Sequence, residues 1–268
     1  MTDKTFPPDW HPDQTFGEGR IGLHIADHVA TLAIQIPQKM NALDTAATAG
    51  MVAALEAARD HARVLIMTGT GGRAFISGAD IGGFDGEERH GDSFMDRQRM
   101  LRDYPLPTIA AIRGYCIGGG LMTALNCDIR LASSDASFGI PAARLGIAYG
   151  MEGVASLVAA VGPARARRIL YVGDRVDAQT ALAWGLVEHV YTPEMLWTEA
   201  LQMAKRIAEN APLSVSATKA TVAAVLADPD QRDMDAIAAL SLQCQTSADF
   251  REGRDAFHQK RAPQFRGI

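Results

Sequence analysis

Apolar and polar residues follow two different spacings along the chain, and each spacing predicts a kind of element. Apolar positions alternate with polar ones over 21–34, with a break at 26–28, which is typical of a β-hairpin. Over 47–58 the apolar residues return at helical spacing, behind Asp44, a residue type that caps helix N-termini. Short apolar runs predict buried strands at 64–67, 109–112, 129–132 and 136–138. Because strands and helices alternate through the first 190 residues, we expect an α/β fold with crossover connections.

The later part of the chain is predicted to become entirely helical. Helices are expected at 153–161, 163–172 and 178–184, followed by a last short strand at 187–190. From Pro193 onward the spacing is helical, with breaks near Pro212 and Pro229. The first residues are rich in proline and glycine and show little periodicity. The sequence therefore predicts an N-terminal arm (1–19), a core (20–192) and a C-terminal helical region (193–268).

Three consecutive glycines follow the apolar run at 109–112. Gly118, Gly119 and Gly120 lead into 121–125, which has the pattern of a buried helix. A strand that turns through glycines into a helix leaves backbone N–H groups unpaired, and the helix dipole favours negative charge there. Glycine also lets a ligand approach the backbone closely. The stretch fits an oxyanion site and, equally well, a close-packed helix start without a ligand.

A second glycine-containing segment follows the predicted strand at 64–67. Its residues 74–81 read A-F-I-S-G-A-D-I, and residues 117–120 read I-G-G-G. Together these segments resemble the two oxyanion-hole segments of the crotonase (enoyl-CoA hydratase/isomerase) superfamily. Further matches occur in the family's order at 37–43 (P-Q-K-M-N-A-L), 126–130 (N-C-D-I-R), 136–141 (A-S-F-G-I-P) and 145–146 (L-G). The resemblance runs from about Gly22 to the C-terminus and implies a crotonase-type ββα spiral core with a C-terminal helical trimerisation region.

The resemblance implies an enzyme that acts on acyl-CoA thioesters. The backbone amides of Ser77 and Gly119 would hold the thioester oxygen while negative charge develops on it. Contacts with CoA are implied for Lys39, Met40, Ala42, Gly78, Ala79, Asp80, Ile81, Phe257 and Lys260. For Lys260, a solvated helix charge is an equally good interpretation. The CoA thioester is the substrate, so neither a separate cofactor nor a metal is expected.

Two positions depart from the hydratase pattern. Hydratases of this family carry two glutamates at the positions of Met122 and Ala142, and neither replacement can exchange a proton. Tyr149 and Glu152 remain as candidate acid–base groups. Tyr149 lies where methylmalonyl-CoA decarboxylases of the superfamily carry a tyrosine, and Glu152 equally fits a first-turn carboxylate of a helix. Arg144 fits either a partner for a substrate carboxylate or a salt bridge between subunits.

Three functions therefore remain open. The chain could be an enoyl-CoA hydratase/isomerase-like lyase, a malonyl-type acyl-CoA decarboxylase or a non-catalytic acyl-CoA binder. The first two need an oxyanion hole, and decarboxylation needs no strong base because departure of CO2 itself generates the enolate. The third fits intact glycine segments combined with missing acids.

Composition and charge limit the kinds of binding partner and the cellular location that the sequence leads us to expect. The 268 residues are 47% hydrophobic and 21% charged, as in ordinary globular proteins. A net charge of −5 gives no electrostatic reason to expect binding to nucleic acid or an anionic membrane. The three cysteines lack metal-ligand spacing, and neither a signal peptide nor an 18-residue apolar span is evident, so a cytoplasmic location is expected. The family resemblance implies a homotrimer or a dimer of trimers.

Overall fold

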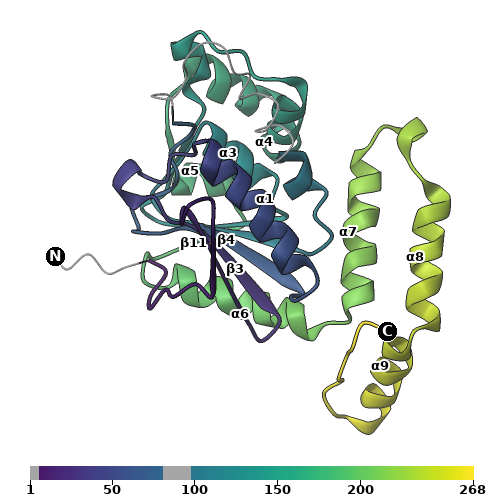
Figure 1. Ribbon diagram of the computed structural model, residues 1–268. Helices are drawn as coiled ribbons and strands as arrows, with labels where there is room; N and C mark the ends of the chain where they lie inside the picture. The colour runs from purple at the N-terminus through teal and green to yellow at the C-terminus, as the bar shows by residue number, and fades with distance from the viewer. Residues whose placement is uncertain (1–5, 81–97) are drawn as a thin grey trace.

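The computed structural model describes residues 6–80 and 98–268, and its strands form two sheets (Figure 1). The larger sheet has seven strands in the order β1 (Gln14–Phe16), β2 (Ile21–Ala26), β3 (Val29–Ile34), β4 (Val64–Gly69), β6 (Thr108–Ile112), β8 (Ile129–Ser133) and β11 (His189–Tyr191). The smaller sheet has four strands in the order β10 (Val176–Asp177), β9 (Ser137–Gly139), β7 (Tyr115–Ile117) and β5 (Ala74–Ile76). From β3 to β11 the larger sheet is parallel, as crossover connections require.

Successive strands of the chain alternate between the two sheets. β4, β6 and β8 lie in the larger sheet, and each is followed by a short strand in the smaller one, β5, β7 and β9 respectively. The chain thereby winds as a spiral in which equivalent strands of consecutive turns pair side by side in parallel. This arrangement confirms the expected ββα spiral, although the sequence shows no matching internal repeat.

The strand before the three glycines differs from the prediction. The sequence predicts that the strand at 109–112 turns directly into the helix, whereas the structure places a second strand, β7, between them. The chain leaves the larger sheet at Gly114, whose φ of +66° belongs to the left-handed region. A Cβ atom at this position would lie 2.1 Å from the Arg73 carbonyl oxygen, so the close approach of the two segments requires glycine. The glycine turn is therefore attached to the smaller sheet.

Two layers of helix cover the larger sheet. α1 (Thr45–Arg59) contacts β1, β2 and β3 on one face, and α6 (Leu196–Glu209) packs across β3, β4, β6 and β8 on the other. Successive side chains of β4 therefore point to opposite faces of the sheet. Val64 and Ile66 pack against α6, whereas Leu65 and Met67 join the main core on the other face. Each such fully buried side chain contributes about 1.5–3 kcal/mol relative to an exposed one.

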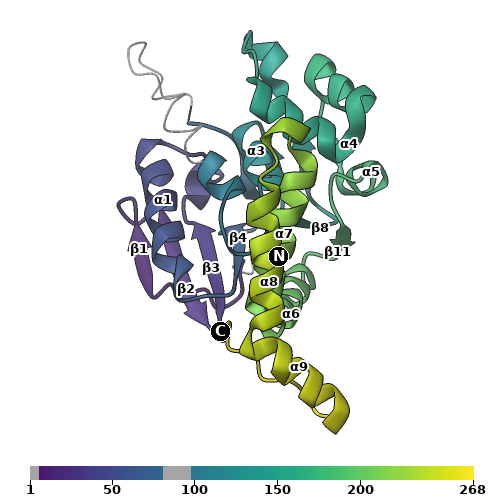
Figure 2. The same ribbon diagram turned by 90° about the vertical axis from the view of Figure 1, so that its right-hand side faces the viewer.

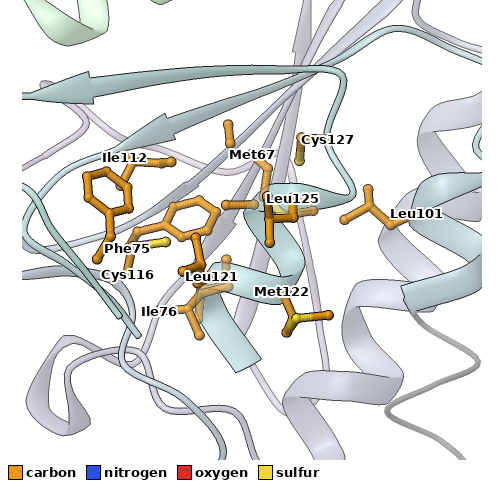
Figure 3. Packing of buried hydrophobic residues seen from close by; sticks show 14 of the residues in the cluster. Met67, Phe75, Ile76, Leu101, Ile112, Cys116, Leu121, Met122, Leu125 and Cys127 are labelled. Carbon is orange, nitrogen blue, oxygen red and sulfur yellow. The ribbon is translucent and has the colours of Figure 1, made fainter. Parts of the chain in front are cut away.

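The main core fills the space between the two sheets and the helix after the glycines, α3 (Gly119–Leu125). Figure 3 shows Met67 and Ile112 of the larger sheet near Phe75 and Cys116 of the smaller one, with Leu121 of α3 beside them. All five side chains are fully buried. Residues 98–102 form a further helical segment, and Leu101 joins the same cluster. The core thus fixes α3 against the end of the smaller sheet.

Local signals predicted most of the helix boundaries correctly. Asp44 caps α1 by accepting a hydrogen bond from the Ala47 N–H at 2.8 Å. α4 (Met151–Val172) bends at Gly162, so the two helices expected there are confirmed as two halves of one element. α5 (Ala178–Trp184) begins after the cap Asp177, as expected. Two 3₁₀ turns complete the core, η1 (Pro37–Lys39) and η3 (Pro141–Leu145).

The N-terminal segment is more ordered than the prediction of an arm implies. Gln14–Phe16 form the edge strand β1, which pairs antiparallel with β2. Asp13 anchors its start, because its carboxylate accepts a hydrogen bond from the Ile25 N–H at 3.0 Å. The sequence did not predict this strand, since three residues are too few to show alternation.

The C-terminal region consists of helices that extend beyond the core. They are α7 (Pro212–Leu226), η4 (Pro229–Gln231), α8 (Met234–Thr246) and α9 (Ala248–Gln259). The breaks at Pro212 and Pro229 were predicted, whereas the break at Ser247, which caps α9, was not. Figure 1 shows α7 and α8 side by side next to the core, and Figure 2 shows the same pair from the side. Lys219 ties α7 to the core, because its ammonium nitrogen lies 2.8 Å from both the Leu106 carbonyl and the Asp128 carboxylate. Among the described residues, none of the helices is long and apolar enough to span a membrane.

Candidate active site

The two predicted donor segments meet at one edge of the smaller sheet. β5 and β7 are parallel neighbours, with Ile76 opposite Cys116, so the residues that follow the two strands lie together. A Cβ atom at Gly118 would lie 4.0 Å from the Gly78 Cα, and one at Gly120 would lie 2.1 Å from the Ile76 carbonyl oxygen. Only glycine at position 120 permits this approach of α3 to the end of β5.

The N–H group of Gly119 precedes the first hydrogen bonds of α3. Gly119 is the first residue of the helix, and the bond from the Met122 N–H to the Gly118 carbonyl, at 3.1 Å, closes the first turn. An N–H group at this position has no acceptor within its own helix. Gly118 adopts φ 56° and ψ −118°, a conformation almost restricted to glycine, and thereby sets the direction of the peptide that carries this N–H.

The N–H group of Ser77 is already engaged by a backbone carbonyl. It donates to the Met40 oxygen at 3.2 Å, which is at the long end of the range for N–H···O bonds. Ser77 itself is half-buried at the end of β5. A bound oxygen at this position would therefore share the amide with Met40 or displace it.

Tyr149 lies beside the second donor segment and the start of α4. A Cβ atom at Gly118 would lie 3.6 Å from the Tyr149 hydroxyl oxygen, and one at Gly153 would lie 3.6 Å from its ring. The residue ends the loop before α4, and burial raises its pKa to about 12. The phenol is therefore neutral at ordinary pH, where it can donate a hydrogen bond or a proton but cannot act as a base.

The two positions that hold glutamate in hydratases are buried and apolar here. Met122 and Ala142 are both nearly inaccessible to solvent. The Met122 side chain packs on Gly153, where a Cβ atom would lie 2.3 Å from its methyl carbon. Methionine thus fills the space that leads from α3 to the start of α4, and no proton-transfer group occupies either position.

Ion pairs engage the other two charged candidates. Glu152 lies 3.1 Å from Arg99 and 3.7 Å from Arg102, so it connects the first turn of α4 to the helical segment at 98–102. Arg144 pairs with Asp174 at the surface and donates to the Val172 carbonyl at 3.3 Å. Glu152 lies in the first turn of α4, as one of its two interpretations expects. The Arg144 pair lies within one chain, so it is not the salt bridge between subunits that the sequence offered as an alternative.

Most of the predicted CoA-contacting residues lie on two adjacent segments. Leu43 and Ala79 form a parallel bridge, which brings 39–42 alongside 77–80. Lys39 donates to the Asp80 carboxylate at 2.7 Å, and this hydrogen bond raises the pKa of the lysine. Of the predicted residues, this juxtaposition includes Lys39, Met40, Ala42, Gly78, Ala79 and Asp80. Ile81 lies outside the described residues.

Phe257 and Lys260 lie far from these segments within one chain. Both are at the C-terminal end of α9, where the Phe257 side chain is 81% exposed. Figures 1 and 2 show α9 at the opposite end of the molecule from α3. The structure of the single chain therefore does not bring these two predicted residues to the donor site.

Two buried polar side chains near the donors were not predicted. The Asn41 side chain accepts a hydrogen bond from the Ile36 N–H and donates to the carbonyls of Thr70 and Ala74, which precede Ser77. Thr123 donates to the Gly119 carbonyl at 2.9 Å and accepts from Gln98 at 3.0 Å. The available signal was a polar residue within an otherwise apolar segment, which indicates a specific hydrogen-bond partner but not its identity.

Known proteins share both the sequence and this fold. The family model "Enoyl-CoA hydratase/isomerase" matches residues 24–267. The chain is 34% identical over 259 residues to (E)-benzylidenesuccinyl-CoA hydratase of Thauera aromatica, covering 92% of this chain and 99% of that one. It is 35% identical over 246 residues to crotonyl-CoA hydratase of Syntrophomonas wolfei, covering 89% and 95%. The crystal structure of an enoyl-CoA hydratase/carnithine racemase from Magnetospirillum magneticum superposes with a TM-score of 0.86 at 34% identity, covering 93% of this chain and 96% of that one. The chain therefore belongs to the enoyl-CoA hydratase/isomerase family of the crotonase superfamily.

Proposed function

We propose that the chain acts on an acyl-CoA thioester and that the amides of Ser77 and Gly119 stabilise the enolate formed from it. The contact between the ends of β5 and β7 supports this proposal, because the residues that follow the two strands, Ser77 and Gly119 among them, lie on neighbouring segments. Fixed donors aimed at a developing oxyanion are worth far more in a partly buried site than in water. The CoA thioester is itself the substrate, so the proposal includes no further cofactor and no metal.

Tyr149 decides which reactions this site supports best. Its hydroxyl lies beside Gly118, and burial keeps it protonated. It can therefore deliver a proton to the α-carbon of an enolate. Hydration of a double bond, by contrast, requires a base that activates water. The candidate carboxylate for that role, Glu152, would have to leave its ion pair with Arg99.

The second candidate function is decarboxylation of a malonyl-type CoA. The bond between the α-carbon and the carboxylate breaks, its electron pair moves into the thioester to give the enolate, and CO2 leaves. Tyr149 then protonates the α-carbon and recovers its proton from solvent. The apolar, buried Met122 and Ala142 favour this reaction, because loss of CO2 needs no base and an apolar surrounding disfavours the charged carboxylate.

A mass-spectrometric screen of the purified protein tests both candidates. The substrates are crotonyl-CoA, a 3-enoyl-CoA, and malonyl-, methylmalonyl- and ethylmalonyl-CoA, without added cofactor or metal. Wild type is compared with Tyr149→Phe and with Glu152→Gln. Decarboxylation weakened by Tyr149→Phe supports the second candidate, whereas hydration abolished by Glu152→Gln assigns the acid–base work to that carboxylate. Saturable binding of the thioesters without any turnover would instead indicate an acyl-CoA binder.

We also propose that the chain assembles as a homotrimer or a dimer of trimers. The support is the apolar surface of the C-terminal region, where Val225, Leu226 and Leu242 are 65%, 72% and 61% exposed. Phe257 belongs to α9, which lies at the opposite end of the molecule from α3 (Figure 1), and this fits a contact of Phe257 with another chain. Light scattering is expected to give three or six times the 28.7 kDa of one chain. A mass of one chain at micromolar concentration would contradict the assembly.

A further inference from the structure

Asn41 is a fully buried side chain that bonds three backbone groups from different parts of the chain. Its exposed fraction is 0%. The side-chain oxygen accepts from the Ile36 N–H at 2.9 Å, and the side-chain nitrogen donates to the carbonyls of Ala74 at 2.7 Å and Thr70 at 3.0 Å. Both hydrogens of the amide and one of its acceptor sites are thereby used. The side chain thus joins the 36–41 loop to the start of β5.

The backbone around Asn41 adopts a conformation that needs such support. Met40 and Asn41 both lie in the left-handed region, with φ values of 53° and 56°. Asparagine tolerates this region better than other residues with a side chain, whereas methionine does not favour it. The Asn41 N–H also donates to the Ile36 carbonyl at 2.9 Å, so main chain and side chain together close the loop on Ile36. Such conformations persist where the surrounding contacts determine them.

This loop holds the carbonyl that faces the Ser77 amide. The Met40 oxygen accepts the Ser77 N–H at 3.2 Å, and Asn41 is the next residue. On the other side, Asn41 holds Ala74, the first residue of the short strand that ends just before Ser77. Gly69 permits the approach, because a Cβ atom there would lie 2.5 Å from the Asn41 amide nitrogen. One side chain therefore fixes both the strand that carries the amide and the carbonyl opposite it.

We propose that Asn41 is a positioning residue for the oxyanion donor at Ser77. It sets the direction of the Ser77 N–H by bonding the start of β5. It also holds the Met40 carbonyl in a position where a substrate oxygen can replace that carbonyl as the acceptor of the Ser77 N–H. The proposal rests on the proposed function, since it assigns Asn41 a role in holding the donor that the thioester would use.

A chromophoric thioester measures this role directly. The absorption of 4-dimethylaminocinnamoyl-CoA moves to longer wavelength when its carbonyl accepts hydrogen bonds, and at saturation the size of the shift does not depend on affinity. With wild type we expect a red shift. With Asn41→Ala we expect less than half of that shift at saturation. Asn41→Asp retains the oxygen that accepts from the Ile36 N–H. When its carboxyl group is protonated, it also offers one hydrogen-bond donor to the carbonyls of Thr70 and Ala74. We therefore expect this variant to restore an intermediate shift.

A matched control separates positioning from a general loss of stability. Thr68 is also fully buried, and its hydroxyl donates to the Ala111 carbonyl at 2.8 Å, away from the Ser77 segment. Thr68→Val is expected to lower the melting temperature but to leave the saturated shift unchanged. A full wild-type shift in folded Asn41→Ala would overturn the positioning role. Absence of any shift in wild type would instead overturn the proposed function, so the two failures are distinguishable.

Discussion

Replacement of Gly119 by proline is expected to lower kcat/KM for the thioester that the chain turns over by about 10²–10³-fold, the usual cost of removing one oxyanion donor. Proline lacks the N–H group and is well suited to the first position of a helix, where Gly119 lies. The bonds of α3 are therefore retained while one proposed donor is lost. Steady-state kinetics, with product measured by mass spectrometry, provides the comparison.

Gly119→Ala is the matched control for this prediction. Alanine adds the same Cβ atom as proline but keeps the N–H group, so we expect it to retain most of the activity. Circular dichroism and binding of free CoA show whether each variant is folded and keeps its nucleotide contacts. If Gly119→Pro were as active as Gly119→Ala, the thioester oxygen would not be held by this amide.

Tyr149→Phe is expected to slow protonation of the enolate by about 10²–10⁴-fold, the usual contribution of a positioned acid. The ring that packs near Gly153 is retained, so affinity for the thioester is expected to stay within a few fold. Because burial raises the pKa of Tyr149 to about 12, the phenol keeps its proton as pH rises from 7 to 10. The wild-type rate is therefore expected to show no decline from loss of this proton over that range.

Decarboxylation of methylmalonyl-CoA in D2O separates the chemical role of Tyr149 from a structural one. Wild type is expected to place deuterium on one face of the α-carbon, whereas Tyr149→Phe is expected to release the enolate and give a racemic product. An unchanged rate together with unchanged stereochemistry would show that another group delivers the proton.

The elements that could be predicted are those that depend on neighbouring residues. Asp44 and Asp177 cap the helices that follow them, and both signals lie within a few residues of the bonds they make. Gly162 followed by Pro163 predicted the bend in α4 for the same reason. Capping and helix breaking are local effects, so a single sequence is enough to reveal them.

The elements that could not be predicted depend on partners distant in sequence. β7 has three residues and owes its existence to pairing with β5 and β9, and β1 depends in the same way on β2. The sequence pattern of a three-residue segment carries too little periodicity to separate such a strand from a loop. The division of 108–117 between two sheets was therefore missed.

In the candidate site, too, local motifs could be predicted from the sequence, whereas contacts between distant residues could not. Family motifs predicted Ser77 and Gly119, and the structure brings their segments together at one sheet edge. The partners of Glu152 and the bond from the Ser77 amide to Met40 were not foreseen, because each joins residues from separate turns of the spiral. Side-chain and carbonyl partners of this kind become visible only after the chain has been folded.

The buried thiol of Cys116 can be used to measure local opening of the smaller sheet. It lies on β7, directly before the glycine turn, and burial raises its pKa well above the ordinary value. A thiol in this state reacts with alkylating agents only after the strand separates from its neighbours. The rate of alkylation at Cys116, followed by peptide mass spectrometry, therefore measures how often the end of the smaller sheet opens, and bound ligands that hold this edge closed would slow it.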